Sequence, residues 1–169
     1  MTLAPSADDT WLRDLYDQHW ASMVRLASLL LGSSDHADEV VQDVLVNMYR
    51  HRDRLQGSPV GGYLRRAVVN GCRSVMRHRV VVLMHQQAPE LVTDAADQRL
   101  LASERNATVM AALRRLPQRQ QEVLVLRYYS DLSEQEIADA LGISRGSVKS
   151  HASRGMQGLR SILTKEGTR

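Results

Sequence analysis

Residues 132–150 constrain the fold more than any other part of this 169-residue chain. Ser133 and Glu136 have the spacing of a capping box, in which each side chain bonds to the backbone amide of the other residue, so a helix should begin there. Gly142 follows where that helix must end, because glycine readily adopts the left-handed backbone conformation of a helix terminus. Ser144 is suited to cap a second helix. Two helices joined by so short a turn form a helix-turn-helix, whose second helix enters the major groove of DNA.

The second helix of this motif has two distinct faces. Side chains three and four residues apart share one face of a helix, and we expect the inward face to hold Val148, Ala152, Met156 and Leu159. The polar side chains left for DNA are then Arg145, Ser147, Lys149, Ser150, Ser153 and Arg154. A plain helical hairpin is the alternative, but it does not require the cap, the small Ala138 and the turn glycine together.

The rest of the chain also has helical periodicity, and no segment shows the convincing alternation of a strand. Apolar residues recur at three- and four-residue steps, which predicts helices over about 12–30, 35–51, 62–78 and 106–163, the last with a break at Pro117. Gly32 should end the first helix, and Ser33, Ser34 or Asp35 should cap the second. A loop is predicted over 57–62. The fold class is therefore all-α.

The helix predicted over 62–78 carries an apolar face and a cationic face. Leu64, Val68, Cys72 and Val75 form the apolar face, so Cys72 is expected to be a small buried hydrophobic residue. The cationic face holds Arg66, Asn70, Arg73 and Arg77. A merely solvated cationic face is the alternative, but residues 54–89 contain no Asp or Glu to pair with it. Guanidinium and carboxamide groups suit phosphates and base edges, so we favour a nucleic-acid contact.

Charge is strongly segregated along the chain. The formal net charge is +3, but residues 1–50 contribute −5, 51–80 contribute +6, 81–104 contribute −3 and 105–169 contribute +5. Two basic blocks separated by acidic residues indicate two contacts with a polyanion, although ordinary solvated charge would give a similar count.

Several other classes of protein are disfavoured. No stretch approaches the roughly 20 apolar residues that span a bilayer, and the first ten residues lack the basic region of a signal peptide. Cys72 is the only cysteine, and the six histidines have no metal-ligand spacing. The sequence has no glycine-rich phosphate loop and no nucleophile elbow. We expect a cytoplasmic protein without membrane insertion, catalytic residues, metal or cofactor.

Motifs in both halves of the chain together resemble a known family. Residues 113–127 and the helix-turn-helix ending at Gly146–Ser150 resemble region four of bacterial RNA polymerase sigma factors. Ala37–Val44 resembles the core-binding helix of their region two, and Tyr63–Asn70 resembles the adjoining promoter-melting helix. The resemblance covers about 11–80 and 105–163. It leaves no room here for a region one extension or a separate region three domain, which is typical of the extracytoplasmic-function group of the sigma-70 family.

The resemblance implies two small helical domains on a flexible linker. Residues 11–80 would form region two, which binds core polymerase and recognises and melts the minus-ten element. Residues 105–165 would form region four, which recognises the minus-thirty-five element. The linker, 81–104, has 24 residues and reaches at most about 80 Å when extended. Two turns of DNA span only about 70 Å, so the linker could join domains bound to both elements.

Family residue roles carry over to matching positions. Asp38, Glu39, Gln42 and Asp43 fall where such factors contact the coiled coil of the polymerase β′ subunit, and region four is implied to contact the β flap. Arg66, Asn70, Arg73 and Arg77 fall on the minus-ten helix, and the 57–62 loop lies near where a flipped base would be captured. Arg145, Ser147, Lys149, Ser150, Ser153 and Arg154 belong to the minus-thirty-five reader. Tyr63, where many members have Trp, and Ser74, where many have Asp, depart from the pattern.

The implied function is promoter-directed initiation of transcription by core RNA polymerase, with an anti-sigma factor as a further partner of the kind common in this group. Two alternatives come from other classes. A stand-alone helix-turn-helix regulator would bind operators as a dimer and would need no acidic first domain. A nuclease or hydrolase would show activity on nucleic acid as the isolated chain.

Overall fold

The computed structural model describes residues 7–34, 36–55, 59–85 and 104–167, and this part of the chain is helical with no strand, as the sequence predicts. Its elements are α1 (Ala7–Leu31), α2 (Ala37–Arg50), the 3-10 turn η1 (Arg52–Arg54), α3 (Val60–His85), α4 (Glu104–Arg114), α5 (Gln118–Tyr128), α6 (Glu134–Leu141) and α7 (Arg145–Gly167). None of the described helices is long and apolar enough to cross a bilayer.

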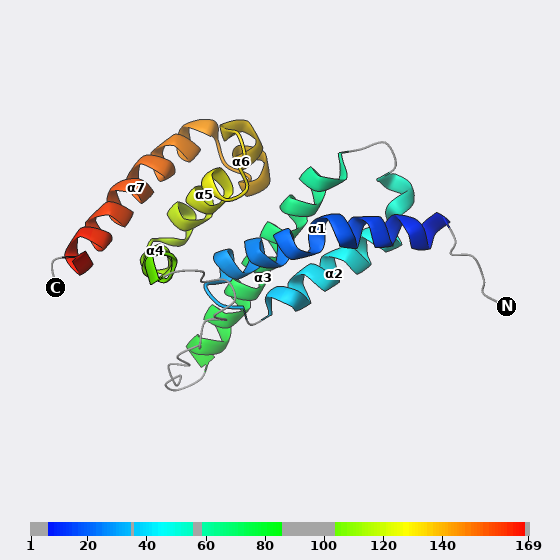
Figure 1. The fold of residues 1–169 in the computed structure, drawn as a ribbon, viewed down its shortest axis with the longest axis horizontal. Helices are drawn as coiled ribbons and strands as arrows, with labels where there is room; N and C mark the ends of the chain where they lie inside the picture. The colour runs from blue at the N-terminus through cyan, green and yellow to red at the C-terminus, as the bar shows by residue number, and fades with distance from the viewer. Residues whose placement is uncertain (1–6, 35, 56–58, 86–103, 168–169) are drawn as a thin grey trace.

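The N-terminal half is a bundle of α1, α2 and α3, each of which contacts the other two (Figure 1). Each helix buries the apolar stripe of its sequence, and Leu26, Val41 and Leu64 are completely buried at the centre. Cys72 is also completely buried, and its burial raises the pKa of the thiol to about 12. The prediction of a small buried hydrophobic residue is therefore confirmed, and the thiol stays protonated at neutral pH.

The C-terminal half is built around α7, which contacts α4, α5 and α6 (Figure 1). Val123, Leu126, Ile137 and Val148 are completely buried there. Gly155 allows α7 to approach α5 closely, because a Cβ at this position would lie 3.1 Å from a methyl carbon of Leu124 on α5.

The two halves pack against each other, and their buried apolar residues form one continuous cluster. The contacts run from α1 to α5 and from α3 to α6. Gln121 on α5 donates from Nε2 to the carbonyl oxygen of Leu29 on α1 at 2.7 Å, and Arg73 on α3 is hydrogen-bonded to Glu122 on α5. The sequence predicts two linked domains, but it contains no signal for this contact between them.

Helix boundaries differ from the expectation at two places. Helix α2 begins at Ala37 after His36, which has a φ of 63° and forms no side-chain cap, so the predicted caps at Ser33 and Ser34 are wrong. The main-chain carbonyl of Ser34 instead accepts from the amide of Ala37 at 3.1 Å. Asp35 lies outside the described residues.

Helix α3 is longer than predicted at both ends. It begins at Val60, directly after Pro59, so Gly61 and Gly62 are helical and not part of the predicted loop. It continues to His85 because the run after residue 79 is apolar and contains neither Gly nor Pro, so the first residues of the expected linker are helical. The remainder of the linker, 86–103, lies outside the described residues.

Gly71 on α3 allows a close approach to α2, which generates a stability prediction. A Cβ there would lie 2.8 Å from Cγ1 of Val40, whereas a Cβ at Gly62 on the same helix meets nothing within 4 Å. Overpacking costs about 1–3 kcal/mol and loss of a helical glycine gains about 0.5–1 kcal/mol, so Gly71→Ala should lower the free energy of unfolding by about 1–2 kcal/mol.

Gly62→Ala is the matched control, and it should leave stability unchanged or raise it by up to about 1 kcal/mol. Urea denaturation of both variants followed by circular dichroism measures the difference. Equal effects at the two positions would contradict the importance of the Gly71–Val40 contact.

Candidate nucleic-acid interface

The helix-turn-helix of α6 and α7 forms through the bonds that its sequence predicts. The hydroxyl of Ser133 accepts from the amide of Glu136 at 3.3 Å, and the amide of Ser133 donates to the Glu136 carboxylate at 2.9 Å. These bonds lower the pKa of Glu136. Gly142 ends α6 with a φ of 64°, and the Ser144 hydroxyl accepts from the amide of Ser147 at 3.1 Å to begin α7. The prediction of a capping box and a left-handed turn is confirmed.

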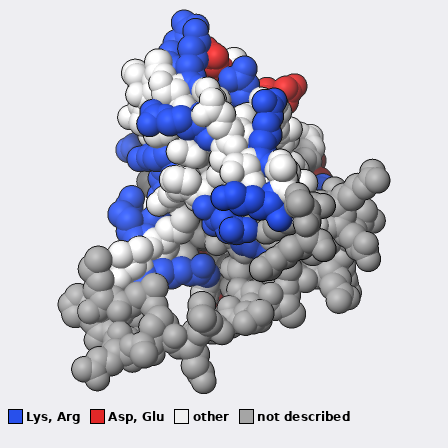
Figure 2. Space-filling model, turned by 90° about the vertical axis from the view of Figure 1, so that its left-hand side faces the viewer, with Lys and Arg blue, Asp and Glu red and all other residues white. Residues whose placement is uncertain are grey.

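Helix α7 has the two faces expected of a recognition helix. Val148 and Ala152 are buried, and Met156 and Leu159 are half-buried against the rest of this half. Ser147 is half-buried, and the exposed side chains are Arg145, Lys149, Ser150, Ser153 and Arg154. Figure 2, which faces the side of α4 and α7, shows many Lys and Arg side chains over the described part of the surface, with the most prominent Asp and Glu side chains near the top. A surface of this charge suits a phosphate backbone.

One acidic side chain interrupts this cationic surface. The carboxylate of Glu134, in the first turn of α6, lies 3.7 Å from Arg127, 3.9 Å from Arg145 and 3.7 Å from Lys149. The cations come from α5 and α7, so no helical spacing in the sequence joins them. Sequence analysis therefore missed Glu134, although its place at the start of α6 puts it beside the start of α7.

The four residues on the cationic face of α3 do not share one environment in the structure. Arg66, Asn70 and Arg77 are exposed, but the side chain of Arg73 is only 13% exposed. Nε and Nη2 of Arg73 donate to the two carboxylate oxygens of Glu122, both at 3.3 Å, and Nη2 also donates to the carbonyl oxygen of Leu141 at 3.2 Å. Three of the four side chains are therefore available to a ligand in this arrangement, and the fourth is held by the other half of the chain.

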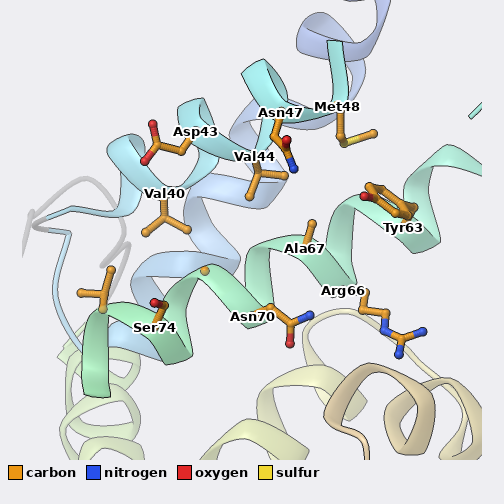
Figure 3. Close-up of a pocket in the computed structure, with 12 residues that line it drawn as sticks. Val40, Asp43, Val44, Asn47, Met48, Tyr63, Arg66, Ala67, Asn70 and Ser74 are labelled. Atoms are coloured by element: carbon orange, nitrogen blue, oxygen red, sulfur yellow. The ribbon is translucent and has the colours of Figure 1, made fainter. Parts of the chain in front are cut away.

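A groove of about 620 Å³ lies along the surface where α2 and α3 meet. Asp43 and Asn47 line it from α2, and Tyr63, Arg66 and Asn70 line it from α3 (Figure 3). Amide and guanidinium groups form hydrogen bonds with base edges, and a partly exposed Tyr offers a face for stacking. Of the 57–62 loop expected to lie near a captured base, residues 57 and 58 are outside the described part of the chain.

The acidic residues of α2 form an exposed surface of their own. Asp38, Glu39, Gln42 and Asp43 are all exposed. The Glu39 carboxylate lies 2.8 Å from Nδ1 of His36, and Asp43 reaches the rim of the groove in Figure 3. Among the described residues, no three His, Cys, Asp or Glu side chains lie close enough to hold a metal ion.

Two family models match the chain in sequence order. Residues 15–80 match Sigma-70 region 2, and residues 107–159 match Sigma-70, region 4. The first model covers α2 and most of α1 and α3, and the second covers the helix-turn-helix.

Curated relatives match over nearly the full chain. The ECF RNA polymerase sigma factor SigL of Mycobacterium tuberculosis is 30% identical over 97% of this chain and 95% of its own length. The ECF RNA polymerase sigma factor SigM of the same species is 32% identical over 88% of this chain and 75% of its own length.

Solved structures share the fold. The sigma factor RpoE of Bartonella quintana, in complex with the anti-sigma factor NepR, superposes with a TM-score of 0.69 and 23% identity, over 90% of this chain and 98% of that one. CnrH, in complex with the cytosolic domain of CnrY, gives a TM-score of 0.68 and 24% identity, over 91% of this chain and 88% of that one.

The position of Glu134 generates a prediction about binding to DNA. The Glu134→Gln variant should bind mixed-sequence duplex DNA up to about fivefold more tightly than the unmodified chain, because exposed ion pairs are worth at most about 1 kcal/mol. Fluorescence anisotropy at low and high salt measures the effect, which should shrink as salt is added.

Asp131→Asn is the matched control, since it removes one exposed negative charge from the turn between α5 and α6, and asparagine also tolerates the left-handed backbone at that position. If the control raises the affinity as much as Glu134→Gln does, overall charge and not the position of Glu134 governs binding.

Proposed function

This chain belongs to the extracytoplasmic-function RNA polymerase sigma factors of the sigma-70 family, and from that membership we propose which of its surfaces perform each step of initiation. The chain directs transcription initiation at promoters, and sigma factors in general do so by binding core RNA polymerase and promoter DNA. The observation that carries the proposal is that the exposed acidic face of α2 and the exposed cationic faces of α3 and α7 lie within the two matched regions.

We propose a division of labour between the two halves. Residues 11–80 bind core polymerase and engage the minus-ten element, and residues 105–165 engage the minus-thirty-five element as duplex. Residues 81–104 connect them, although α3 extends to His85, so its last turns belong to the N-terminal half.

The polymerase contact is assigned to α2. Asp38, Glu39, Gln42 and Asp43 are exposed and lie on one side of a helix whose apolar side is buried in the bundle. An acidic, exposed helix face is suited to a basic partner, and the assignment places it against the β′ coiled coil. The contact with the β flap of the polymerase is assigned to the C-terminal half of the chain.

The promoter contacts are assigned to two helices. On α3, Arg66, Asn70 and Arg77 engage the minus-ten element directly, and Arg73 joins them once it is released from Glu122. The minus-thirty-five contacts are Arg145, Ser147, Lys149, Ser150, Ser153 and Arg154. A guanidinium suits a bidentate contact with a guanine edge, and the compact ammonium of Lys149 suits a phosphate.

Three broader properties complete the proposal. Sigma factors are not enzymes in general, and we assign this chain no catalytic activity of its own and no cofactor. It acts in the cytoplasm, where the polymerase is. An anti-sigma factor is a further partner, of the kind bound to RpoE of Bartonella quintana.

The assignment of α2 predicts a loss of polymerase binding. The double variant Gln42→Ala, Asp43→Arg should bind core polymerase at least about tenfold more weakly, because a like charge at an interface costs more than the roughly 1.4 kcal/mol of one decade in affinity. Both residues are exposed, so the helical content should not change. Co-elution and titration with purified core polymerase measure binding.

The matched control is Asp17→Arg with Gln18→Ala, which changes the same residue types at exposed positions of α1. The control should bind as the unmodified chain does. Unchanged binding by the α2 variant would exclude this face as the polymerase contact.

The two promoter contacts should be separable on different templates. If Arg154 contacts a base, Arg154→Ala should cost about 1–3 kcal/mol on a complete promoter and relax one upstream position. Lys149→Ala should weaken all upstream sequences similarly, as expected of a phosphate contact. Neither should matter on a template whose minus-ten segment is already melted and whose upstream duplex is absent.

Asn70→Ala should show the opposite pattern and impair opening even when the upstream element is intact. Open-complex formation by the holoenzyme on both templates provides the measurement. An equal defect of Arg154→Ala on the truncated, pre-melted template would refute the division of labour.

A further inference from the structure

We propose that the C-terminal half carries a binding site for a free amphiphile with one unbranched apolar chain and an anionic head group. The apolar chain occupies a hollow between α4, α5 and α7, and the head group lies beside Arg25 and Tyr129. This inference is independent of the promoter and polymerase contacts proposed above. It adds a small-molecule ligand to the macromolecular partners of the protein.

The hollow has a volume of about 360 Å³ and an apolar lining. Val109 and Met110 line it from α4, Val125 from α5 and Leu159 from α7, and Leu29 contributes from the end of α1. In the described part of the chain, every residue that lines it is Leu, Val, Met or Tyr. Ligand pockets typically measure about 300–1,000 Å³ and are mostly apolar, so this hollow has the size and character of one.

The lining side chains are poorly suited to hold water. Val109, Met110 and Leu159 are half-buried, so part of their apolar surface faces the hollow. A water molecule needs about two to four polar partners to be held in a cavity. Among the lining side chains, only two tyrosines carry a polar group. An apolar chain that enters the hollow therefore gains contacts without displacing well-bound water.

Two of the lining residues can adapt to the shape of a ligand. Met110 belongs to α4 and Met156 to α7, and both are half-buried. Methionine has an unbranched and flexible side chain, which fills irregular spaces and tolerates repacking. The hollow is therefore suited to a flexible, unbranched chain.

Tyr129 joins the hollow to polar groups of α1. Its ring lines the hollow, and its hydroxyl donates to the carbonyl oxygen of Ser22 at 3.4 Å. Burial raises the pKa of Tyr129, and the guanidinium of Arg25 offsets part of this rise by its positive charge and by a hydrogen bond. A cation and a hydroxyl group therefore lie together beside the apolar space.

Arg25 is free to face an anion at this place. Its side chain is exposed, and its Nε donates to the carbonyl oxygen of Ala21 at 3.3 Å within its own helix, so the Nη groups are the donors left for a ligand. Hydrogen bonds from a guanidinium to an anionic oxygen are stronger than those between neutral groups. An amphiphile whose chain fills the hollow can thus place an anionic head group against Arg25 and Tyr129.

The dimensions favour a single apolar chain over a segment of another protein. A helix is about 10–12 Å across with its side chains, and two turns of it occupy roughly 900 Å³. The hollow, at about 360 Å³, admits a few side chains of such a helix but not the helix itself. One guanidinium and one hydroxyl also match one anionic head group.

Leu29 gives the site a connection to the rest of the molecule. It belongs to α1, and its carbonyl oxygen accepts from Nε2 of Gln121 on α5 at 2.7 Å. The amphiphile contacts both α1 and the C-terminal half, so it binds most tightly when the two are packed together. A ligand shifts an equilibrium toward the state that binds it more tightly, so the concentration of the amphiphile becomes a signal that this protein senses.

Binding is tested in the full-length chain with octanoate, decanoate and dodecanoate below their micelle concentrations. Isothermal titration calorimetry should show that each added methylene tightens binding by about three- to fourfold, as expected when a CH₂ group leaves water. Methyl NMR of the methionines locates the site. The signals of Met110 and Met156 should shift, whereas that of Met48, which is buried in the N-terminal bundle, should not.

A substitution that fills the hollow should block the apolar chain. Val109→Trp should weaken decanoate binding by at least about tenfold, since an indole would occupy the space of several methylene groups. Val46→Trp is the matched control, because Val46 is 42% exposed on α2 and does not line the hollow, and it should leave the affinity unchanged. Circular dichroism establishes that both variants remain folded.

The anionic head group is tested separately, so that the proposal does not depend on one variant. Arg25→Gln should weaken decanoate binding by about three- to fivefold, the range of an exposed ion pair, and should leave the binding of decanol unchanged. Arg13→Gln is the matched control at another exposed position of α1, about 18 Å away along the helix, and it should change neither.

Several results would overturn the proposal. The absence of carboxylate binding, or an affinity that does not depend on chain length, would exclude the apolar site. Equal weakening by Val109→Trp and Val46→Trp would place any binding elsewhere, and equal weakening of decanoate and decanol by Arg25→Gln would exclude the anionic head group.

Two further measurements distinguish other occupants of the hollow. Sedimentation with phosphatidylglycerol vesicles should leave the protein in the supernatant, and cosedimentation that Val109→Trp abolishes would identify a membrane lipid and contradict a free amphiphile. If no carboxylate binds and Val109→Trp loses core polymerase, the hollow is a protein contact and the proposal fails. Calorimetry and NMR use the free chain without polymerase or DNA, so their failure leaves the proposed function untouched.

Discussion

The arrangement of this molecule depends on one buried carboxylate. Glu122 is almost completely enclosed, and it is satisfied by cations from both halves and by an amide of its own helix. Without Arg73 this carboxylate would be an under-compensated charge in a low-dielectric interior, which is among the costliest defects in a folded protein. The pairing therefore fixes which surface of α5 faces α3. With that surface of α5 facing α3, α6 lies over part of the cationic face of α3, and Gln121 lies beside the end of α1.

The sequence predicted the local structure of the functional surfaces well. The capping box at Ser133, the left-handed Gly142 and the inward Val148 are all determined by residues close together in the chain, so their spacing carries the information. The caps expected at Ser33 and Ser34 failed because the main-chain carbonyl of Ser34 supplies the bond that a side chain was expected to make.

Side-chain environments set by distant segments could not be predicted in the same way. Helical periodicity placed Arg73 on one face with Arg66, Asn70 and Arg77, and it is correct about the direction of that face. Helical periodicity carries no information about Glu122, which pairs with Arg73 on that face, because Glu122 lies 49 residues further along the chain. Glu134 escaped detection for the same reason, since the cations beside it belong to neighbouring helices. The residue roles at the polymerase and promoter contacts remain predictions.

The carboxylate of Glu134 has a consequence for how a promoter is distinguished from the rest of a genome. A duplex that binds α7 in the proposed way must draw Arg145 and Lys149 away from this acid, and it must also tolerate the negative charge of Glu134 near its phosphates. Every sequence bears that cost equally, but only one with matching base edges offsets it through specific hydrogen bonds. Discrimination between partners is a difference of affinities, which a uniform cost leaves unchanged, but the same cost lowers the occupancy of weakly bound, non-specific DNA. With about 10⁶–10⁹ competing sites in a genome, a single acidic residue beside the recognition helix would reduce the time that the protein spends on irrelevant DNA.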